Sequence, residues 1–586
     1  MKYFEIIARK LRKARQLKNE KGWRGIERHL GARFSAFREA RNYRKWMRRR
    51  RLTDEKRRAI RRRIEGLKHR PRLSVVVPVY DVEEKWLRRC LESVFEQLYE
   101  NWELCVADDH SPRPHIRKIL EEYAARDRRV KVVFRETNGH ISAASNSALE
   151  LATGEFCVLL DHDDELTEDA LFWVARELNE RPETAMIYSD EDLIDERGRR
   201  FSPKFKPDFS RDLFYSLNLV THLSAYRTDV LRAIGGFRGG LEGSQDYDLA
   251  LRFTEAIDEK QIRHIPKILY HWRAISGSVA LSSDEKPYAH ERARRALSEH
   301  FARTGKAASV SRGIYQLHRV RYELPANPPR VSLILSTTGD TETAKNPVER
   351  FIEATAYENL EIVVIAPDKR RDRSPLGSVK TISRGDSSNA DVLNRAASVA
   401  GGEILCFVDA HLRPLSKDWL EELASFALQT EIGAVGGKIL GRNETVSGGA
   451  SIVGFGGALG AAFRGLPRAH DGYLYRARVV NNFSAVSAGC LAVRRALFDE
   501  TGGFDAENLP DSLFDADFCL RLGEKNFRVV FTPYAELIEI EKSGLHSEPT
   551  AAEIEFFRRN WQNVIARDPF YNPNLSLAGE TFTIEI

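Results

Sequence analysis

The sequence of 586 residues has little cysteine and no long apolar run. Its start, MKYFEIIARKLRKAR, is interrupted by charges, so we expect no secretory signal. The longest uncharged stretch, residues 445–463, is rich in glycine and predicts a loop or strand rather than a membrane span. The six cysteines lack metal-ligand spacing and have apolar neighbours, which favours buried thiols in a reducing compartment. We therefore expect a cytoplasmic protein that does not cross a bilayer.

The charge of the chain is distributed unevenly. Residues 1–72 carry 28 Lys and Arg against 7 Asp and Glu, a net charge of +21, and the remainder carries −15. Apolar residues from Trp23 to Phe37 follow helical spacing between these cations. A basic helix with an aromatic face is attracted to an anionic membrane surface. We expect residues 1–70 to form a basic helical arm at the inner face of the cell membrane, or alternatively to dock on the acidic body. Nucleic acid is not an expected partner, because no recognition fold accompanies the arm.

The body alternates short β-branched runs with amphipathic segments, which predicts parallel, doubly wound α/β sheets. A second run, RVSLIL, begins at Arg330 after the proline-rich residues 324–329, which we interpret as a linker. Three motifs recur in the same order: GE at 154 and 402, GGF at 235 and 502, and DYDLALR at 246 as DADFCLR at 515. This recurrence predicts a duplicated domain. The predicted parts are the arm (1–70), the first copy (71–325) and the second copy (326–586).

A cluster of carboxylates follows the apolar residues 156–160. Asp161, Asp163, Asp164 and Glu165 would repel one another if ionised together, unless a cation lies among them. Ligands of open α/β sheets bind beyond the carboxyl ends of the strands. Oxygen ligands suit Mg²⁺ or Mn²⁺, which share their coordination with substrate phosphates. We therefore expect a metal and diphosphate site, with an acidic helix N-cap as the alternative.

Several motifs lie in a fixed order between residues 72 and 280. They are VVVPVYD (75–81), VADDHS (106–111), TNGHISAASNSALELATGE (137–155), LLDHDD (159–164), GGFRGGLEGSQDYDLALR (235–252) and YHWR (270–273). In this order they make the first copy resemble a family 2 glycosyltransferase with the GT-A fold. The resemblance implies two tandem GT-A domains after the arm, and a nucleotide-sugar donor.

The resemblance also implies roles for single residues. The expected donor contacts are Asp81 and Asp108 with the base, Asp161 with the ribose side and Arg273 with the phosphates. The expected metal ligands are Asp163, Asp164 and His271, with a contact to the diphosphate as the alternative for His271.

Asp246 matches the inverting catalytic base of the family. The residue types support this role independently, because a metal-stabilised nucleoside diphosphate leaves without a proton donor and a single carboxylate then suffices as base. A glycosidase would instead need two carboxyl groups. We assign Asp190 and Asp192 to the donor or acceptor pocket, and Asp248 to a structural role.

The second copy keeps fewer of these residues. Alignment on Gly402 places Asp409 at the position of Asp161, His411 at Asp163 and Leu412 at Asp164, while Asp515 matches Asp246. The copy still resembles the second domain of large bacterial two-domain glycosyltransferases that build surface polysaccharide. We interpret it as a degenerate, acceptor-holding or scaffolding domain. A second active site at Asp409, His411 and Asp515 remains the alternative, because histidine can bind a divalent ion.

The predicted protein is an inverting, metal-dependent glycosyltransferase. It would transfer a hexosyl or deoxyhexosyl group to a hydroxyl of a lipid-linked or polysaccharide acceptor in bacterial surface-glycan or O-antigen assembly. The alternatives are a bifunctional polymerase with two active centres and a non-catalytic carbohydrate-binding or assembly protein.

Overall fold

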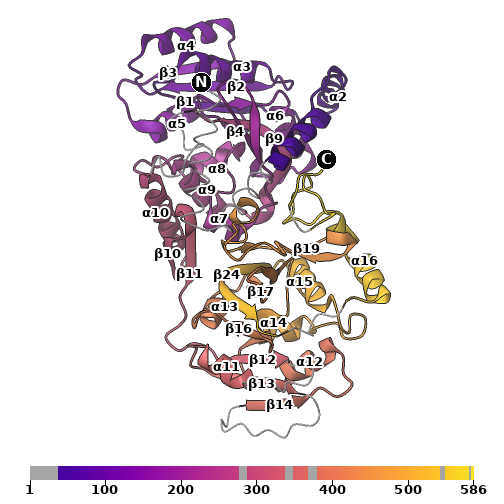
Figure 1. The fold of residues 1–586 in the computed structure, drawn as a ribbon. Coiled ribbons are helices and arrows are strands. Elements are labelled where there is room, and N and C mark those ends of the chain that lie inside the picture. Colours follow the sequence, from indigo (N-terminus) through magenta and orange to yellow (C-terminus); the bar gives the residue numbers. More distant parts are fainter. Residues whose placement is uncertain (1–36, 276–286, 337–346, 367–378, 542–547, 580–581) are drawn as a thin grey trace, which may run out of the picture.

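A computed structural model describes residues 37–275, 287–336, 347–366, 379–541, 548–579 and 582–586. Two mixed sheets, each flanked by helices, follow one another along the chain (Figure 1). The prediction of two tandem α/β domains is therefore confirmed. No helix in the described ranges is both long enough and apolar enough to cross a bilayer.

The first sheet has the strand order β3-β2-β1-β4-β8-β6-β9-β5, with β7 paired to β6. Its strands are β1 (Leu73–Val79), β2 (Trp102–Asp108), β3 (Val130–Phe134), β4 (Phe156–Leu159), β5 (Glu165–Leu166), β6 (Met186–Ile194), β7 (Arg200–Lys204), β8 (Ser224–Arg227) and β9 (Ile262–Arg273). Strand β1 is parallel to β2 and β4, whereas β8 is antiparallel to β4. All residues of β1 and β2 are buried, as expected for parallel strands covered on both faces.

Helices and a hairpin complete the first copy and lead to the second. The helices are α3 (Glu84–Phe95), α4 (Pro114–Arg126), α5 (His140–Leu151), α6 (Ala170–Glu180), α7 (Arg211–Ser216), α8 (Thr228–Ala233), α9 (Gln245–Glu255) and α10 (Pro287–Arg303). The hairpin of β10 (Ala308–Arg312) and β11 (His318–Tyr322) follows α10.

The second sheet has the order β14-β13-β12-β15-β23-β17-β24-β16, which repeats the topology of the first. Its strands are β12 (Val331–Ser336), β13 (Leu360–Ala366), β14 (Val379–Ser383), β15 (Ile404–Asp409), β16 (Leu412–Pro414), β17 (Ile432–Leu440), β23 (Cys490–Arg494) and β24 (Arg528–Glu539), with β18 (Val446–Gly448) and β21 (Asn481–Asn482) at the side. A small sheet holds β19 (Ala450–Val453), β20 (Leu459–Ala461) and β22 (Ala485–Val486). The helices are α11 (Pro347–Glu353), α12 (Asn389–Val399), α13 (Trp419–Ala427), α14 (Arg495–Glu500), α15 (Phe514–Glu524) and α16 (Ala551–Ala566).

A buried polar contact explains why a Gly-Glu pair recurs in both copies. The Ser74 hydroxyl donates to Glu103 Oε1 at 2.6 Å and accepts from the Gly154 amide at 2.9 Å. A Cβ at Gly154 would lie 2.6 Å from the Arg72 carbonyl, so only glycine fits this close approach. The second copy repeats these bonds with Ser332, Glu361 and Gly402.

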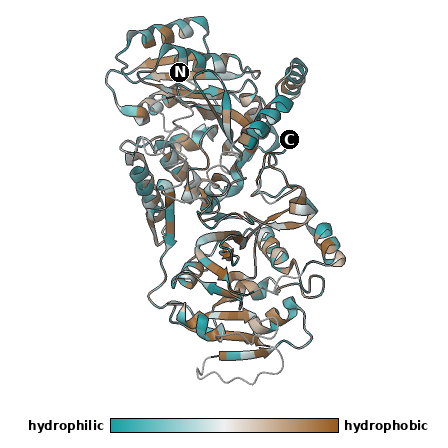
Figure 2. Ribbon diagram, in the orientation of Figure 1, coloured by the Kyte–Doolittle hydropathy of each residue, from teal (hydrophilic) through white to brown (hydrophobic). Residues whose placement is uncertain are grey.

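The described part of the arm is a helix over residues 37–50 followed by α2 (Asp54–Glu65). Figure 2 shows α2 as largely hydrophilic. Tyr43 and Trp46, however, are buried, and the Trp46 ring lies 5.2 Å from that of Phe205 in the first copy. The Trp46 indole also donates to Asn574 Oδ1 at 3.3 Å. This part of the arm therefore docks on the body, which was the alternative to membrane contact, and Trp23 lies outside the described residues.

A buried polar network joins the two copies. Asp212 of α7 accepts hydrogen bonds from Asn482 Nδ2 at 2.7 Å and from Arg528 Nε at 2.9 Å, both on strands of the second sheet. Asp212 is 2% exposed. All six cysteines are buried and unpaired, in agreement with the sequence-based expectation.

Candidate functional site

Strands β1, β2 and β4 end at the same edge of the first sheet, where three of the predicted donor ligands lie. Asp81 is exposed, and its carboxylate forms an ion pair with Arg113. Asp108 is buried at the end of β2, and its Oδ1 accepts from the Ser111 amide at 3.3 Å. Asp161 follows β4 and is half-buried. The carboxylates are thus presented at the edge where α/β sheets bind ligands.

A cavity of about 520 Å³ at this edge is lined by both Asp161 and Asp246. Its walls come from the ends of β1 and β4, the starts of α5 and α9, residues 217–224, α10 and β11. Two carboxylates that are far apart in the sequence therefore face one space, which is large enough for a small polar ligand.

Asp246 is held by the first turn of α9. It is half-buried, and Asn218 Nδ2 donates a hydrogen bond to its Oδ2 at 2.9 Å. Burial raises the pKa of Asp246, while the Tyr247 amide and Asn218 oppose that rise. The neighbouring Asp248 is fully buried and pairs with Arg252 Nε at 2.9 Å, so its carboxylate does not reach the cavity.

Asp161, Asp164 and His222 form a cluster whose ligand atoms lie within 4.8 Å of one another. His222 stacks on Tyr270 with ring centroids 4.5 Å apart, and burial lowers its pKa to about 4, so the imidazole is neutral and can act as a ligand at neutral pH. Asp164 is fully buried, and its oxygens accept from the Tyr270 hydroxyl at 2.6 Å and the Arg273 amide at 2.7 Å. Burial, Asp163 and Asp161 together raise the pKa of Asp164.

This donor set fits a divalent ion, because a cation would relieve the repulsion between the carboxylates. Two carboxylates and one imidazole are compatible with Mn²⁺ and similar ions. His222 carries no motif and stands in VTHLS, so sequence reasoning missed it. Asn218 was missed for the same reason.

The structure does not bring the imidazole of His271 or the guanidinium of Arg273 to this cluster, although the Arg273 backbone amide donates to Asp164. Side chains alternate along β9, so Tyr270 and Trp272 line the Asp161 cavity while His271 faces the other way. His271 Nδ1 lies 2.5 Å from Asp192 Oδ1.

Arg273 is buried and holds the loop of residues 163–165 in place. It is 1% exposed and donates through Nε to the Asp163 carbonyl at 2.6 Å. It also forms an ion pair with Glu165 and lies 4.2 Å from the centroid of the Trp86 ring. Arg273 therefore positions residues 163–165, and its guanidinium is not directed at the cavity.

Asp190 and Asp192 lie inside the protein rather than in a substrate pocket. Both are fully buried. Asp190 accepts from Asn572 Nδ2 at 3.0 Å and lies 2.9 Å from His264 Nε2, whereas Asp192 pairs with Arg200 Nε at 2.6 Å. Asp190 therefore links β6 to the segment after α16, and Asp192 links β6 to β7.

The second copy lacks two of the three cluster residues. Strand pairing of β15 with β23 matches that of β4 with β8, which places Gly489 at the position of His222 and Leu412 at that of Asp164. Asp409 remains, and its Oδ1 lies 2.8 Å from His411 Nδ1. Asp515 lies in the first turn of α15 and accepts from the Ala488 amide at 2.9 Å. In the ranges that the structure describes, no second group of three metal-ligating side chains is present.

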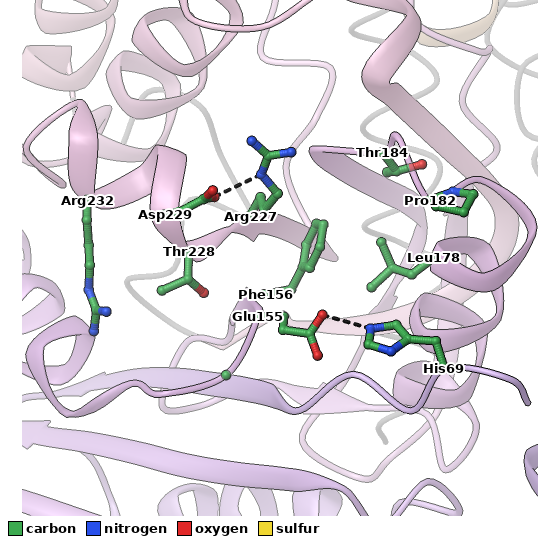
Figure 3. Close-up of a pocket in the computed structure, with 11 residues that line it drawn as sticks. His69, Glu155, Phe156, Leu178, Pro182, Thr184, Arg227, Thr228, Asp229 and Arg232 are labelled. Atoms are coloured by element: carbon green, nitrogen blue, oxygen red, sulfur yellow. Dashed lines mark hydrogen bonds and ion pairs between the residues drawn. The ribbon is translucent and has the colours of Figure 1, made fainter.

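Another cavity of about 520 Å³ lies at the opposite edge of the first sheet, where β4 begins (Figure 3). None of the predicted site residues lines it. Its charged groups are paired locally, with His69 Nε2 2.7 Å from Glu155 Oε2 and Arg227 Nε 2.8 Å from Asp229 Oδ1. This cavity has no clustered carboxylates and does not compete with the Asp161 cavity as a candidate site.

The strand order of the first sheet and the carboxylate-lined cavity at its strand ends agree with the expected GT-A fold. Residues 74–235 match the family described as Glycosyl transferase family 2. The first copy therefore contains a domain of this family, which confirms the resemblance of its motifs.

Three curated relatives are similar to this chain. The "Uncharacterized protein y4gI" of Sinorhizobium fredii is 38% identical over 544 residues, which cover 89% of this chain and 59% of that protein. The "O-antigen biosynthesis protein RfbC" of Myxococcus xanthus is 33% identical over 528 residues, which cover 88% of this chain and 41% of that protein. The "Chondroitin synthase" of Escherichia coli is 31% identical over 206 residues, which cover 35% of this chain and 29% of that protein. The chain thus spans less than two thirds of the length of these relatives.

Proposed function

We propose that the first copy is an inverting, metal-dependent glycosyltransferase centre that uses a nucleotide-sugar donor. The observation that carries this proposal is the shared cavity of Asp161 and Asp246. In this assignment the donor diphosphate lies near Asp161, and the acceptor hydroxyl lies near Asp246. A binding protein would not need a carboxylate base next to the diphosphate subsite.

Asp246 is the proposed general base. Its carboxylate takes the proton from the acceptor hydroxyl as the hydroxyl oxygen bonds to the anomeric carbon, and the bond from that carbon to the nucleoside diphosphate breaks. One displacement on the face opposite the leaving group inverts the anomeric centre. The raised pKa of Asp246 makes the ionised carboxylate a stronger base than an exposed aspartate.

Two further polar atoms at the cavity suit an acceptor. Asn218 Oδ1 and His318 Nδ1 are buried and have no hydrogen-bond partner among the described residues, and both side chains line the cavity. Burial lowers the pKa of His318 to about 3, so its ring is neutral. Hydroxyl groups of a sugar would satisfy both atoms, and leaving them unpaired costs stability.

The proposed metal ligands are Asp161, Asp164 and His222, with Asp163 next to them in the chain. A bound Mg²⁺ or Mn²⁺ would offset the charge of the donor diphosphate. Asp81 and Asp108, at the ends of the neighbouring strands, are the proposed contacts of the nucleotide base. Arg273 is reassigned from a phosphate ligand to a residue that positions the carboxylate loop.

The acceptor is proposed to be lipid-linked or a polysaccharide, in the assembly of a bacterial surface glycan. The support is the similarity over most of the chain to a relative named for O-antigen biosynthesis. We propose a location at the cytoplasmic face of the membrane, where such acceptors are accessible. The second copy is proposed to support the first, because Leu412 and Gly489 replace two of its three metal-ligating residues.

The test is release of nucleoside diphosphate from a panel of sugar nucleotides, with Mn²⁺ or EDTA and a membrane-lipid extract as acceptor source. Asp246→Asn and Asp515→Asn are matched variants, since each removes one charge at the start of equivalent helices. We expect one donor to turn over with metal and only Asp246→Asn to abolish turnover. Two donors that each respond to a different variant would instead identify a bifunctional polymerase. No turnover and no metal-dependent donor binding would refute the catalytic assignment.

A further inference from the structure

A cavity of about 800 Å³ lies between the arm and the first copy. Residues 46–63 form one wall, and the opposite wall consists of residues 165–169, β9 and Asn574. His271 lines this cavity, whereas its neighbour Tyr270 lines the Asp161 cavity. The two cavities are therefore separated by strand β9 and are distinct sites.

The charges around the arm cavity are unbalanced. Eight lining side chains are Lys or Arg: Arg48, Arg50, Arg51, Lys56, Arg57, Arg63, Arg200 and Lys267. Among the described lining residues only three are carboxylates, and each already has a partner. Glu165 pairs with Arg89 at 2.8 Å, Glu168 pairs with Arg57 at 2.7 Å, and Asp169 accepts from the Trp173 indole at 2.7 Å.

Most of the lining cations form no ion pair with a carboxylate of the described residues. Arg57 and Arg200 are paired, and Lys56 donates to the Arg51 carbonyl at 3.0 Å. The remaining five form no ion pair within the described ranges: Arg48, Arg50, Arg51, Arg63 and Lys267.

Lys267 and Arg50 are the most constrained of these unpaired cations. The Lys267 ammonium lies 4.1 Å from the centroid of the Trp173 ring, and the Arg50 guanidinium lies 4.9 Å from that of Trp46. Burial lowers the pKa of Lys267, and the charge of Arg50 lowers it further despite the opposing charge of Asp169. The aromatic rings supply only a weak counter-charge. Glu585 acts on Arg50 and Asp169 acts on Lys267 through their charges, but neither carboxylate forms an ion pair with these cations, so a bound anion would be stabilised.

We propose that the arm cavity binds a ligand through its phosphate groups. One guanidinium group can donate two parallel hydrogen bonds to two oxygens of a phosphate, and an ammonium group adds a point charge. Cations from the helix over residues 37–50, from α2 and from β9 therefore suit a ligand with two or more negative charges. The same chemistry occurs in a soluble diphosphate and in an anionic lipid head group. This inference goes beyond the proposed function, because it concerns a site on the other side of β9 and does not require transfer activity.

The experiment uses the full chain with Asp161→Asn and EDTA, so that the first cavity does not bind diphosphate through a metal. In this background, Arg51→Gln with Lys267→Gln is compared with Arg58→Gln and Arg61→Gln. Both pairs remove two charges, but Arg58 and Arg61 are exposed on α2 and do not line the cavity. The probes are inorganic pyrophosphate, measured by calorimetry, and phosphatidylglycerol vesicles, measured by sedimentation.

We expect the cavity pair to weaken binding of at least one probe by about tenfold or more, and the control pair to change it by less than about threefold. Selective loss for pyrophosphate identifies a soluble diphosphate as the ligand, whereas selective loss for vesicles identifies a lipid head group. Equal effects of both pairs, or no binding of either probe by the parent chain, would overturn the proposal. If the first pair unfolds the protein, Arg51→Gln with Arg63→Gln replaces it, since both side chains are exposed. Donor turnover by the otherwise native chain should persist with the cavity pair, which separates this result from a failure of the proposed function.

Discussion

The hydrogen bond from Asn218 to Asp246 predicts a measurable shift in the pH profile of the transferase. The bond favours the ionised carboxylate, and a hydrogen bond to a charged group contributes about 1.5–3 kcal/mol. Because one pKa unit corresponds to about 1.4 kcal/mol, Asn218→Leu should raise the pKa of Asp246 by about 1–2 units. The base works only when ionised, so the low-pH decrease of kcat/KM should occur about 1–2 pH units higher than in the native protein. The high-pH plateau should also be lower, because the variant loses the proposed contact of Asn218 Oδ1 with the acceptor.

The assay measures release of nucleoside diphosphate as a function of pH. It uses the donor that the panel of sugar nucleotides has identified. Gln245→Leu is the matched control, because it removes an amide from the same cavity at a residue that does not donate to Asp246. If kcat/KM of Asn218→Leu decreases at the same low pH as that of the native protein, the claim that Asn218 lowers the pKa of Asp246 is refuted. An equal loss at every pH, without a shift of the low-pH decrease, would show that Asn218 contributes through acceptor binding alone.

Two further predictions concern stability. Trp46→Ala should weaken the docking of residues 37–50 by about 3–5 kcal/mol and therefore accelerate the hydrogen exchange of their backbone amides. The control Arg44→Ala changes an exposed side chain and should leave the exchange rates unchanged. Equal exchange rates in the two variants would contradict the contact with Phe205. Although burial opposes it, hydrogen bonds from Lys131 and other donors lower the pKa of Glu103 to about 2. The ionised group therefore stabilises the fold above its unfolded pKa of about 4.3, by on the order of 3 kcal/mol, and this stabilisation is lost as the pH falls toward 2. Glu103→Gln should lower the urea midpoint at pH 7 more than at pH 3, and an equal decrease at both values would contradict the assignment.

Local patterns in the sequence were sufficient to predict the architecture. Residues 73–79 are almost entirely apolar because both faces of a parallel strand are covered. A glycine recurs at position 402 because the backbone of Arg330 and Ser332 approaches it too closely for a side chain. The arm was less predictable. Its aromatic spacing indicates a helix with one apolar face, but Trp46 finds its partners in Phe205 and Asn574, which are distant in the sequence.

The candidate site was predicted where residues follow strands or begin helices, and missed where they lie in loops. Asp161 and Asp246 have such positions, and they share a cavity. His222 lies in a loop that reaches the cluster only through the pairing of β8, so no local pattern marks it. His271 lies away from the cluster for a simpler reason. Two-residue alternation along β9 puts it on the face opposite Tyr270, and that alternation could have been read from the sequence.

Comparison of the two copies within one chain separates the needs of the fold from those of the chemistry. The buried contact of Ser74, Glu103 and Gly154 has a full counterpart in the second copy, including the hydrogen-bond pattern. In the second copy two of the three members of the cluster of Asp161, Asp164 and His222 are replaced, at the positions that the matching strand pairs make equivalent. Leu412 is 1% exposed, so an apolar side chain fills the place of the buried Asp164. An uncompensated buried carboxylate is costly, and it is retained only in the copy where a cation and a diphosphate are proposed to bind. The substitution therefore favours stability in the second copy at a place where the first copy is organised for catalysis.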